Sequence, residues 1–253
     1  MKISVLTIFP DFFAAALEEG MIRAALERER LEVQVVPLRD FTDDSHRTTD
    51  DYPFGGGVGM IMKVEPIDRA LQFLGVAERA DRDPGTRVIL LSPQGRLFTQ
   101  ERARRYATRD HLVLVCGRYK GVDERVSEHL ADEELSLGDF VLSGGEPAAL
   151  CVVDAVARLL PGVVGDFDSV ESDSFHSGLL DSTYYTRPAD YRGWRVPDVL
   201  LSGNHAEIAR FRRRQALLRT LERRPELLRS ALLSDEDRRF LSTLRPAEEP
   251  LAE

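Results

Sequence analysis

The chain has 253 residues, of which 43% are apolar and 30% charged, and its 43 acidic and 34 basic side chains give a net charge of −9. This composition predicts a globular protein large enough for one α/β domain and a smaller companion, and the negative charge argues mildly against a nucleic-acid partner. The apolar runs are too short to span a bilayer, the first ten residues do not resemble a signal peptide, and two cysteines without a CxxC pair favour a reducing cytoplasm.

Strands and helices are predicted to alternate through the first half of the chain. Residues 2–9 alternate in polarity and are rich in β-branched side chains, which predicts a strand, and Pro10 and Asp11 then open a helix that runs to about Arg28. The elements expected next are a strand at 31–38, a polar loop at 39–59, a helix at 65–74, a strand at 87–91, a helix at 99–107 with Thr99 as its N-cap, and a strand at 111–116. This alternation predicts an α/β fold with a mostly parallel sheet and helices on both faces.

Two glycine-bearing loops lie between residues 113 and 147. Residues 116–119 follow one apolar strand and residues 142–145 are expected to follow another, so the backbone amides of both loops could line one pocket. Residues 146–160 read as a helix that is apolar nearly all round and therefore buried, with Ser143 and Glu146 spaced as a capping box. Both thiols, Cys116 and Cys151, are expected to be buried.

The nature of the ligand stays open at this stage. The glycines of residues 55–59 match neither a dinucleotide fingerprint nor a phosphate loop, and the first strand-to-helix turn contains no glycine. The five histidines share no spacing that would hold zinc. These observations exclude the common cofactor motifs and leave an unusual site in the second half of the sheet.

The second half of the chain changes composition twice. Residues 162–176 are acidic and rich in glycine and serine, which predicts an interdomain linker. Residues 207–245 contain eleven arginines and six acidic residues, a local net charge of +5. Residues 205–244 are expected to be helical. Such a segment could contact nucleic-acid phosphates, or it could be a solvated helical surface with i,i+4 ion pairs, and composition alone does not choose between them.

An arginine near the end of a buried helix needs a partner. Spacing favours an intrahelical pair between Arg158 and Asp154, and the alternative is that Arg158 faces a pocket and stabilises negative charge on a substrate oxygen. The linker also carries acids, at positions 166, 168, 171 and 173, among which composition does not discriminate. A carboxylate together with an arginine would match the Watson–Crick edge of guanine, where N1–H and N2–H donate and O6 accepts.

Ordered motifs run through the chain: FGGGVGM at 54–60, SPQG at 92–95, GRY at 117–119, GVDERV at 121–126, GDFVLSGGE at 138–146, DAVAR at 154–158, DSF at 173–175, YTRP at 185–188 and VLLSGNHA at 199–206. In this order and spacing they resemble the bacterial tRNA (guanine-N1)-methyltransferases, over residues 1 to about 230. The resemblance implies a SPOUT-class α/β domain with a trefoil knot at residues 1–161, a flexible linker at 162–176 and a small helical tRNA-binding domain at 177–253.

The resemblance further implies an activity and its partners. The enzyme would be a cytoplasmic, obligate homodimer that methylates N1 of guanine 37 of tRNA, next to the anticodon, with S-adenosylmethionine as methyl donor and an active site shared across the dimer. The alternatives are a knotted methyltransferase for another RNA and a non-catalytic RNA-binding protein. The residues expected to hold the cofactor are Leu91, Ser92, Pro93, Gln94, Cys116, Gly117, Tyr119, Gly121, Leu137, Gly138, Asp139, Phe140, Val141, Leu142, Gly144 and Gly145.

By the same resemblance, Asp173 is the general base for the N1 proton and Arg158 supports charge on O6. An ordinary Asp titrates near 3.9, so this base would need help from Arg158 or from burial. Lys120 stands where many relatives have Glu, and a lysine cation cannot ligate a metal, so magnesium is possible but is assigned to no residue. The residues expected to contact tRNA are Asp181, Arg187, Ser202, His205, Arg212, Arg213 and Arg214.

Overall fold

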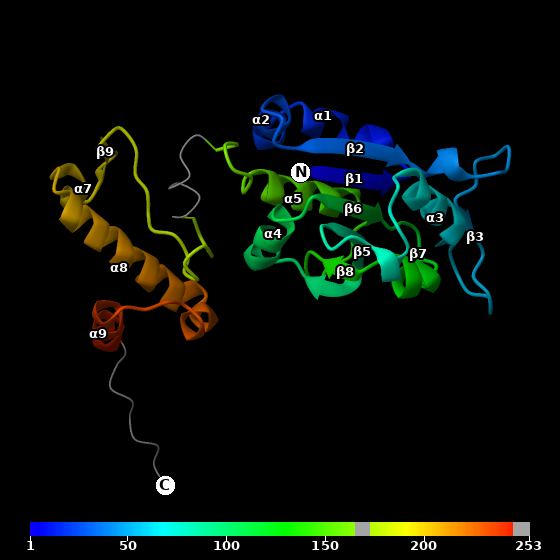
Figure 1. Cartoon of the computed structure of the whole chain (residues 1–253). Helices are drawn as coiled ribbons and strands as arrows, with labels where there is room; N and C mark the ends of the chain where they lie inside the picture. The colour runs from blue at the N-terminus through cyan, green and yellow to red at the C-terminus, as the bar shows by residue number, and fades with distance from the viewer. Residues whose placement is uncertain (165–172, 245–253) are drawn as a thin grey trace, which may run out of the picture. The chain divides into compact units, whose positions relative to one another are not determined.

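The computed structural model describes residues 1–164 and 173–244 (Figure 1). The chain divides into two compact units, Met1–Gly165 and Asp166–Glu253, which are described separately below. Of the linker predicted at 162–176, residues 165–172 lie outside the described range. Among the residues that are described, no helix is long and apolar enough to cross a membrane.

The first unit is built on a five-stranded parallel sheet with the strand order β2-β1-β6-β5-β8 (Figure 1). The predicted parallel α/β sheet is therefore confirmed. Its strands are β1 (Lys2–Thr7), β2 (Glu32–Pro37), β5 (Thr86–Leu97), β6 (His111–Cys116) and β8 (Glu133–Ser136). Because all strands run in the same direction, their carboxyl ends gather at one edge, where ligands bind in open α/β sheets.

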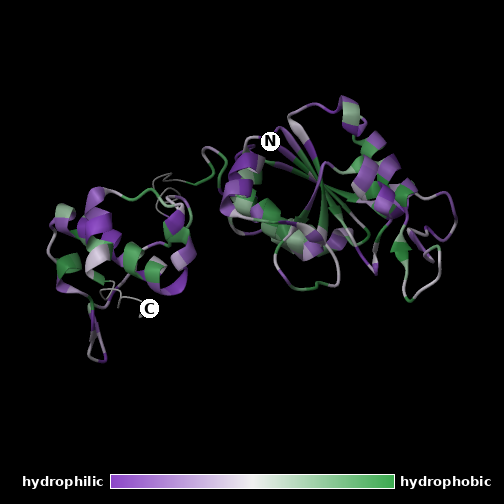
Figure 2. Ribbon diagram, turned by 90° about the horizontal axis from the view of Figure 1, so that it is seen from below, coloured by the Kyte–Doolittle hydropathy of each residue, from purple (hydrophilic) through white to green (hydrophobic). Residues whose placement is uncertain are grey.

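Helices cover both faces of the sheet, as predicted. In β6, Leu112, Leu114 and Cys116 pack toward one face, while Val113 and Val115 pack toward the other. The first face is covered by α2 (Gly20–Glu27), α4 (Gln100–Ala107) and α5 (Glu146–Ala157), and the second by α3 (Val64–Phe73). The central strands are mostly hydrophobic in Figure 2. Each fully buried Leu or Val contributes about 1.5–3 kcal/mol relative to an exposed one.

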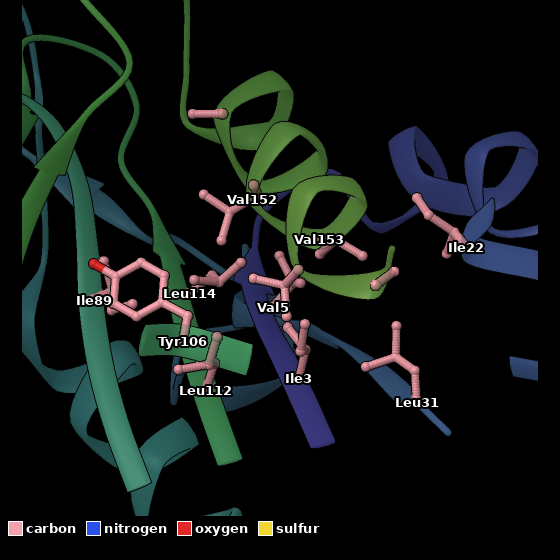
Figure 3. Close-up of a cluster of buried hydrophobic side chains, with 14 of the residues drawn as sticks. Ile3, Val5, Ile22, Leu31, Ile89, Tyr106, Leu112, Leu114, Val152 and Val153 are labelled. Carbon is pink, nitrogen blue, oxygen red and sulfur yellow. The ribbon is translucent and has the colours of Figure 1, made fainter. Parts of the chain in front are cut away.

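The core of the first face joins three helices to the sheet. Val152 and Val153 of α5 lie over Ile3 and Val5 of β1, as Figure 3 shows, and all four are fully buried. Tyr106 of α4 belongs to the same cluster. The predicted Thr99 cap of α4 is confirmed, since its hydroxyl accepts from the Arg102 amide at 3.4 Å.

The predicted helix at residues 10–28 is interrupted. It consists of a 3₁₀ turn, Pro10–Phe13, a short α1 (Ala14–Leu17) and α2. The break falls at Glu18 and Glu19, just before Gly20, the first residue of α2, whose φ is +62°. Glu19 is extended, with a φ of −130° and a ψ of 157°, and Gly20 is left-handed, so the helical hydrogen bonds of α1 do not continue into α2.

Short elements occupy segments that the sequence predicts as loops. A small sheet pairs β3 (Asp50–Asp51), β4 (Ile61–Met62) and β7 (Gly121–Val122), and it joins the 39–60 region to the loop after β6. Three further turns of helix lie at Leu38–Phe41, Arg79–Asp81 and Val126–Leu130. Strands of two residues show no periodicity, which explains why the sequence did not predict them.

Two other expectations fail in the region between β6 and α5. The strand before the second glycine loop is β8, which ends at Ser136, so residues 137–145 form a longer loop than predicted. The cap of α5 is Gly145 rather than Ser143, and no side chain caps the helix there. Helix α5 also exposes Cys151, contrary to expectation, whereas Cys116 is buried as predicted.

The second unit is mainly helical. Residues 205–244, predicted to be helical, contain α8 (His205–Arg223), a 3₁₀ turn at Pro225–Arg229 and α9 (Asp235–Leu244). Helix α8 ends before Pro225, because a residue that precedes proline is disfavoured in the α conformation. Before them lie α7 (Asp198–Leu201) and an unpredicted hairpin of β9 (Asp190–Tyr191) and β10 (Trp194–Arg195).

Candidate active site

A cavity of about 360 Å³ opens at the carboxyl ends of β5, β6 and β8. Residues from three loops line it: the turn inside β5 at 91–94, the loop after β6 at 117–121 and the loop after β8 at 137–145. This is the edge of the sheet at which the fold predicts a ligand, and the volume lies within the range of small-molecule sites.

Most of the residues expected to hold the cofactor line this cavity. They are Leu91, Ser92, Pro93, Gln94, Gly117, Tyr119, Gly121, Leu137, Gly138, Phe140, Val141, Leu142, Gly144 and Gly145. Two expected residues are not among its lining: Asp139 and Cys116, and the latter is fully buried in the core, where burial raises the pKa of its thiol. Arg118, Lys120 and Glu124 also line the cavity. Arg118 lies inside the GRY motif, Glu124 inside the GVDERV motif and Lys120 between the two, and this was the available signal.

Glycine is required where the two loops meet. The Gly145 amide donates to the Gly117 carbonyl at 2.9 Å, and a Cβ on Gly145 would lie 2.7 Å from the Cα of Cys116. A Cβ on Gly144 would lie 2.2 Å from Nε of Arg118. Both distances are shorter than normal non-bonded contacts. A side chain at position 145 would push the backbones of the two loops apart, and one at position 144 would displace the side chain of Arg118.

The cavity wall is partly apolar and partly polar. Phe140 and Leu142 are about half exposed and Val141 is 88% exposed, although all three belong to the cavity lining. Tyr119 has a φ of +60°, an uncommon conformation for a residue with a side chain, and burial together with Asp50 raises the pKa of its phenol.

The donors and acceptors around this cavity fit S-adenosylmethionine. Apolar side chains such as Leu137 and Val141 offer surface for an adenine ring, and the glycine loops bring backbone polar groups close to a ligand. The carboxylate of Glu124 adds a negative charge at the rim, as a sulfonium and an ammonium require.

Lys120 joins the first glycine loop to the loop at 54–60. The Lys120 amide donates to the Met60 carbonyl at 3.1 Å. A Cβ on Gly59 would lie 3.3 Å from the Cβ of Lys120. Among residues 1–164 and 173–244, no group of three or more His, Cys, Asp and Glu side chains is placed to hold a metal ion.

The two expected catalytic residues lie in different units. Arg158 is the C-cap of α5, where its amide donates to the Asp154 carbonyl at 3.2 Å and its side chain is half-buried. Asp173 is half-buried in the second unit, and its carbonyl accepts from the His176 amide at 3.1 Å. Close by, Phe175 adopts a φ of +72°.

In the second unit, two of the expected tRNA contacts surround Tyr184. Asp181 accepts a hydrogen bond from the Tyr184 hydroxyl at 3.1 Å and another from the Ser182 amide at 2.6 Å. The guanidinium of Arg212 lies 5.6 Å from the centre of the Tyr184 ring. Both Tyr184 and Arg212 are exposed.

The other residues expected to contact tRNA differ in their exposure and in their partners within the protein. Arg214 lies over the ring of Phe240 at 5.2 Å, with an exposed side chain. Arg213 instead donates to Asp237, a largely buried carboxylate, and to the Leu232 carbonyl. The remaining three are exposed: Arg187, Ser202 and His205.

Comparison with known proteins identifies the relatives of this chain. A family model described as tRNA (Guanine-1)-methyltransferase TrmD matches residues 1–230. Proteins named tRNA (guanine-N(1)-)-methyltransferase are similar throughout their length. The relative from Dehalococcoides mccartyi is 50% identical over 99% of each chain. The relative from Syntrophotalea carbinolica is 52% identical over 97% of each, and that from Geobacter metallireducens is 50% identical over 96% of this chain and 98% of its own.

Proposed function

The chain belongs to the tRNA (guanine-1)-methyltransferase family, and from this premise we propose that it methylates N1 of guanine 37 in tRNA with S-adenosylmethionine as the donor. The observation that carries the proposal is the cavity at the carboxyl ends of β5, β6 and β8. All but two of the residues that the sequence singles out for the cofactor line it.

We propose that these loops form the trefoil knot of the family and hold the cofactor between them. The contact of Gly145 with Gly117 and the unusual φ of Tyr119 support a cavity whose shape is set by the backbone. When bound, S-adenosylmethionine supplies an electrophilic methyl group. The side chains of this chain then have to orient guanine and remove its N1 proton.

Two residues are proposed for that chemistry. The carboxylate of Asp173 accepts the N1 proton as the new N1–carbon bond forms, so that the methylated base leaves neutral. The guanidinium of Arg158 stabilises the negative charge that develops on O6 as the proton departs. A fixed positive charge that stabilises the guanine anion makes the N1 proton more acidic, which helps a carboxylate to remove it.

We further propose that the enzyme acts as a cytoplasmic homodimer. One subunit would contribute the cavity and Arg158, and its partner would contribute Asp173 together with the tRNA-binding helices. The two free cysteines support a reducing compartment. We assign no ligand for magnesium, since the cavity presents Lys120 where a carboxylate would be needed.

The alternatives raised by the sequence are less well supported. Relatives about 50% identical over almost the whole chain are all named tRNA (guanine-N(1)-)-methyltransferase, which favours a tRNA guanine substrate over another RNA. A non-catalytic RNA-binding protein would have no use for a small-molecule cavity at the edge of its sheet.

The test is methylation of two tRNA transcripts that differ only in guanine or adenine at position 37. We expect N1-methylguanine, identified by mass spectrometry of the nucleosides, in the guanine-bearing transcript alone and only with S-adenosylmethionine present. Methylation of both transcripts, or another methylated base, would refute the assignment of the substrate. A lack of cofactor binding in calorimetry would refute the enzymatic assignment itself.

A further inference from the structure

A fully buried carboxylate lies beneath the cavity. Glu146 is 0% exposed and stands at the first position of α5, where the sequence predicts a capping box. Instead of capping the helix, its two oxygens accept from side chains of other segments: Oε1 from the Thr7 hydroxyl at 2.8 Å and Oε2 from Nε of Arg118 at 3.1 Å. Because burying a carboxylate is costly unless it is paired, these two hydrogen bonds are needed to keep Glu146 inside the protein, and they connect α5 to both partner segments.

The contacts of Glu146 belong to a closed network of side chains that joins three segments: Glu146, Arg118, Phe9 and Thr7. The guanidinium of Arg118 lies 4.4 Å from the centre of the Phe9 ring, and the Phe9 amide donates to the Thr7 hydroxyl at 3.0 Å. This network thus connects the end of β1, the start of α5 and the loop after β6. Its arginine also lines the cavity.

The same network holds the two glycine loops together. Arg118 pairs with Gly144 as an isolated antiparallel bridge, and a Cβ on Gly144 would lie 2.5 Å from Oε2 of Glu146. The side chain of Arg118 therefore fills the space between the first loop and the second. Its position depends on Glu146, the carboxylate to which its Nε donates.

We propose that Glu146 is a positioning residue for the cofactor cavity. Its buried carboxylate fixes Arg118, and Arg118 in turn fixes the spacing between residues 117–121 and 142–145. This inference rests on the proposed function, because it takes S-adenosylmethionine as the ligand of the cavity. Neither Glu146 nor Thr7 lines the cavity, so both act only through other residues.

The decisive variant is Glu146→Gln, which keeps the shape of the side chain and removes its charge. In this variant the ion pair with Arg118 is lost and the guanidinium donates to a neutral amide oxygen, so Arg118 is held less firmly. We expect the Kd for S-adenosylmethionine to rise about tenfold in calorimetry, while kcat at saturating cofactor changes less than about twofold, because the reacting groups are untouched. Amide hydrogen exchange in residues 117–121 and 142–145 should become faster.

A double-mutant cycle separates positioning from general stability. If Glu146 acts through Arg118, the Kd of Arg118→Met combined with Glu146→Gln should equal that of Arg118→Met alone, whereas independent effects would multiply. Phe9→Leu is the variant that should disturb folding least, because Phe9 is 44% exposed. It removes the aromatic ring that the Arg118 guanidinium contacts, so it should raise the Kd for S-adenosylmethionine about threefold.

The possible outcomes are distinct. A wild-type Kd in folded Glu146→Gln, with only a lowered melting temperature, overturns the positioning role and leaves the proposed function standing. Multiplying effects in the cycle overturn it as well. If Glu146→Gln does not fold, an unchanged Kd in Phe9→Leu decides against the proposal. Failure of the wild-type protein to bind S-adenosylmethionine would instead refute the proposed function.

Discussion

Arg213 holds Asp237 by two parallel hydrogen bonds, from Nε at 3.1 Å and from a terminal guanidinium nitrogen at 2.7 Å. The pair ties the middle of α8 to the first turn of α9, and the carboxylate side chain is only 6% exposed. An arginine predicted to contact tRNA therefore serves the packing of the second unit.

Replacement of Arg213 by alanine should destabilise the protein. It leaves the buried carboxylate of Asp237 without its main partner, which we expect to cost about 2 kcal/mol, less than the roughly 3–5 kcal/mol of fully buried pairs because the arginine is partly exposed. Chemical denaturation monitored by circular dichroism measures the change. Arg212→Ala is the matched control and should stay within about 0.5 kcal/mol of the wild type. Equal stability of the two variants would contradict the structural role of Arg213.

The stability of the second unit should depend on pH through the same pair. The hydrogen bond from Arg213 holds the pKa of Asp237 below its ordinary value of 3.8, and Ser234 adds to this. The unfolded chain then binds the proton more readily, so the stabilisation is complete above about pH 5 and is lost as pH falls through the lowered pKa. Thermal unfolding between pH 5 and 2.5 should show a shallower loss in Asp237→Asn than in the wild type. Parallel curves would argue against this linkage.

The exposed arginines should account for the salt dependence of tRNA binding. Arg212→Ala and Arg214→Ala should each weaken binding and reduce the slope of log K against log salt concentration by about one, as expected for the loss of one phosphate contact. Filter binding between 50 and 200 mM salt measures the slope. Arg105→Ala on α4, which removes an equally exposed charge from the other unit, is the control. An unchanged slope in both helix variants would exclude these residues as phosphate contacts.

Gly95 should tolerate no side chain. A Cβ there would lie 2.3 Å from the carbonyl carbon of Glu134 and 2.3 Å from the nitrogen of Leu135, both backbone atoms of β8. Gly95→Ala should therefore destabilise the protein by about 3 kcal/mol, since β5 and β8 must separate. In Gly121→Ala the new Cβ meets nothing within 4 Å, so its urea midpoint should stay near that of the wild type. Similar midpoints for the two variants would show that β8 can shift without cost.

Asp173→Asn should abolish turnover and spare binding. Removal of a general base slows catalysis by roughly 10²–10⁴-fold, whereas an amide of the same shape leaves the contacts of the second unit in place. Single-turnover methylation and tRNA binding measure the two effects, and Asp235→Asn on the surface of α9 is the control. Methylation within about tenfold of the wild-type rate would assign the proton transfer to another group.

The regular elements of the first unit could be predicted because they repeat. In β1 and β6, side chains alternate between two buried faces, and both strands lie at the predicted positions. Thr99 was predicted as a cap because it uses a local hydrogen bond. The break between α1 and α2 was missed because the backbone angles of Glu19 and Gly20 decide it, and both residue types also occur inside helices.

The loops that line the cavity could be predicted from the sequence, but the side-chain contacts between them could not. Ordered motifs identify the loops that line the cavity, because loop residues near a ligand keep their type and spacing. Glu146 was misread as a helix cap, since its true partners, Thr7 and Arg118, are 139 and 28 residues away. The pairing of Arg213 with Asp237 was missed for the same reason, because the two residues are 24 positions apart, and the contact of Arg213 with tRNA stays a prediction.

The sequence by itself determined the α/β class, the strands of the sheet, the basic helices of the second unit and the family to which the chain belongs. These properties depend on periods and motifs that are local in the chain. Only the tertiary structure decided which arginine is held by a buried carboxylate, which side chains pair with Glu146 and where glycine is indispensable. Such properties depend on distances between segments far apart in sequence, and those distances exist only after the chain has packed.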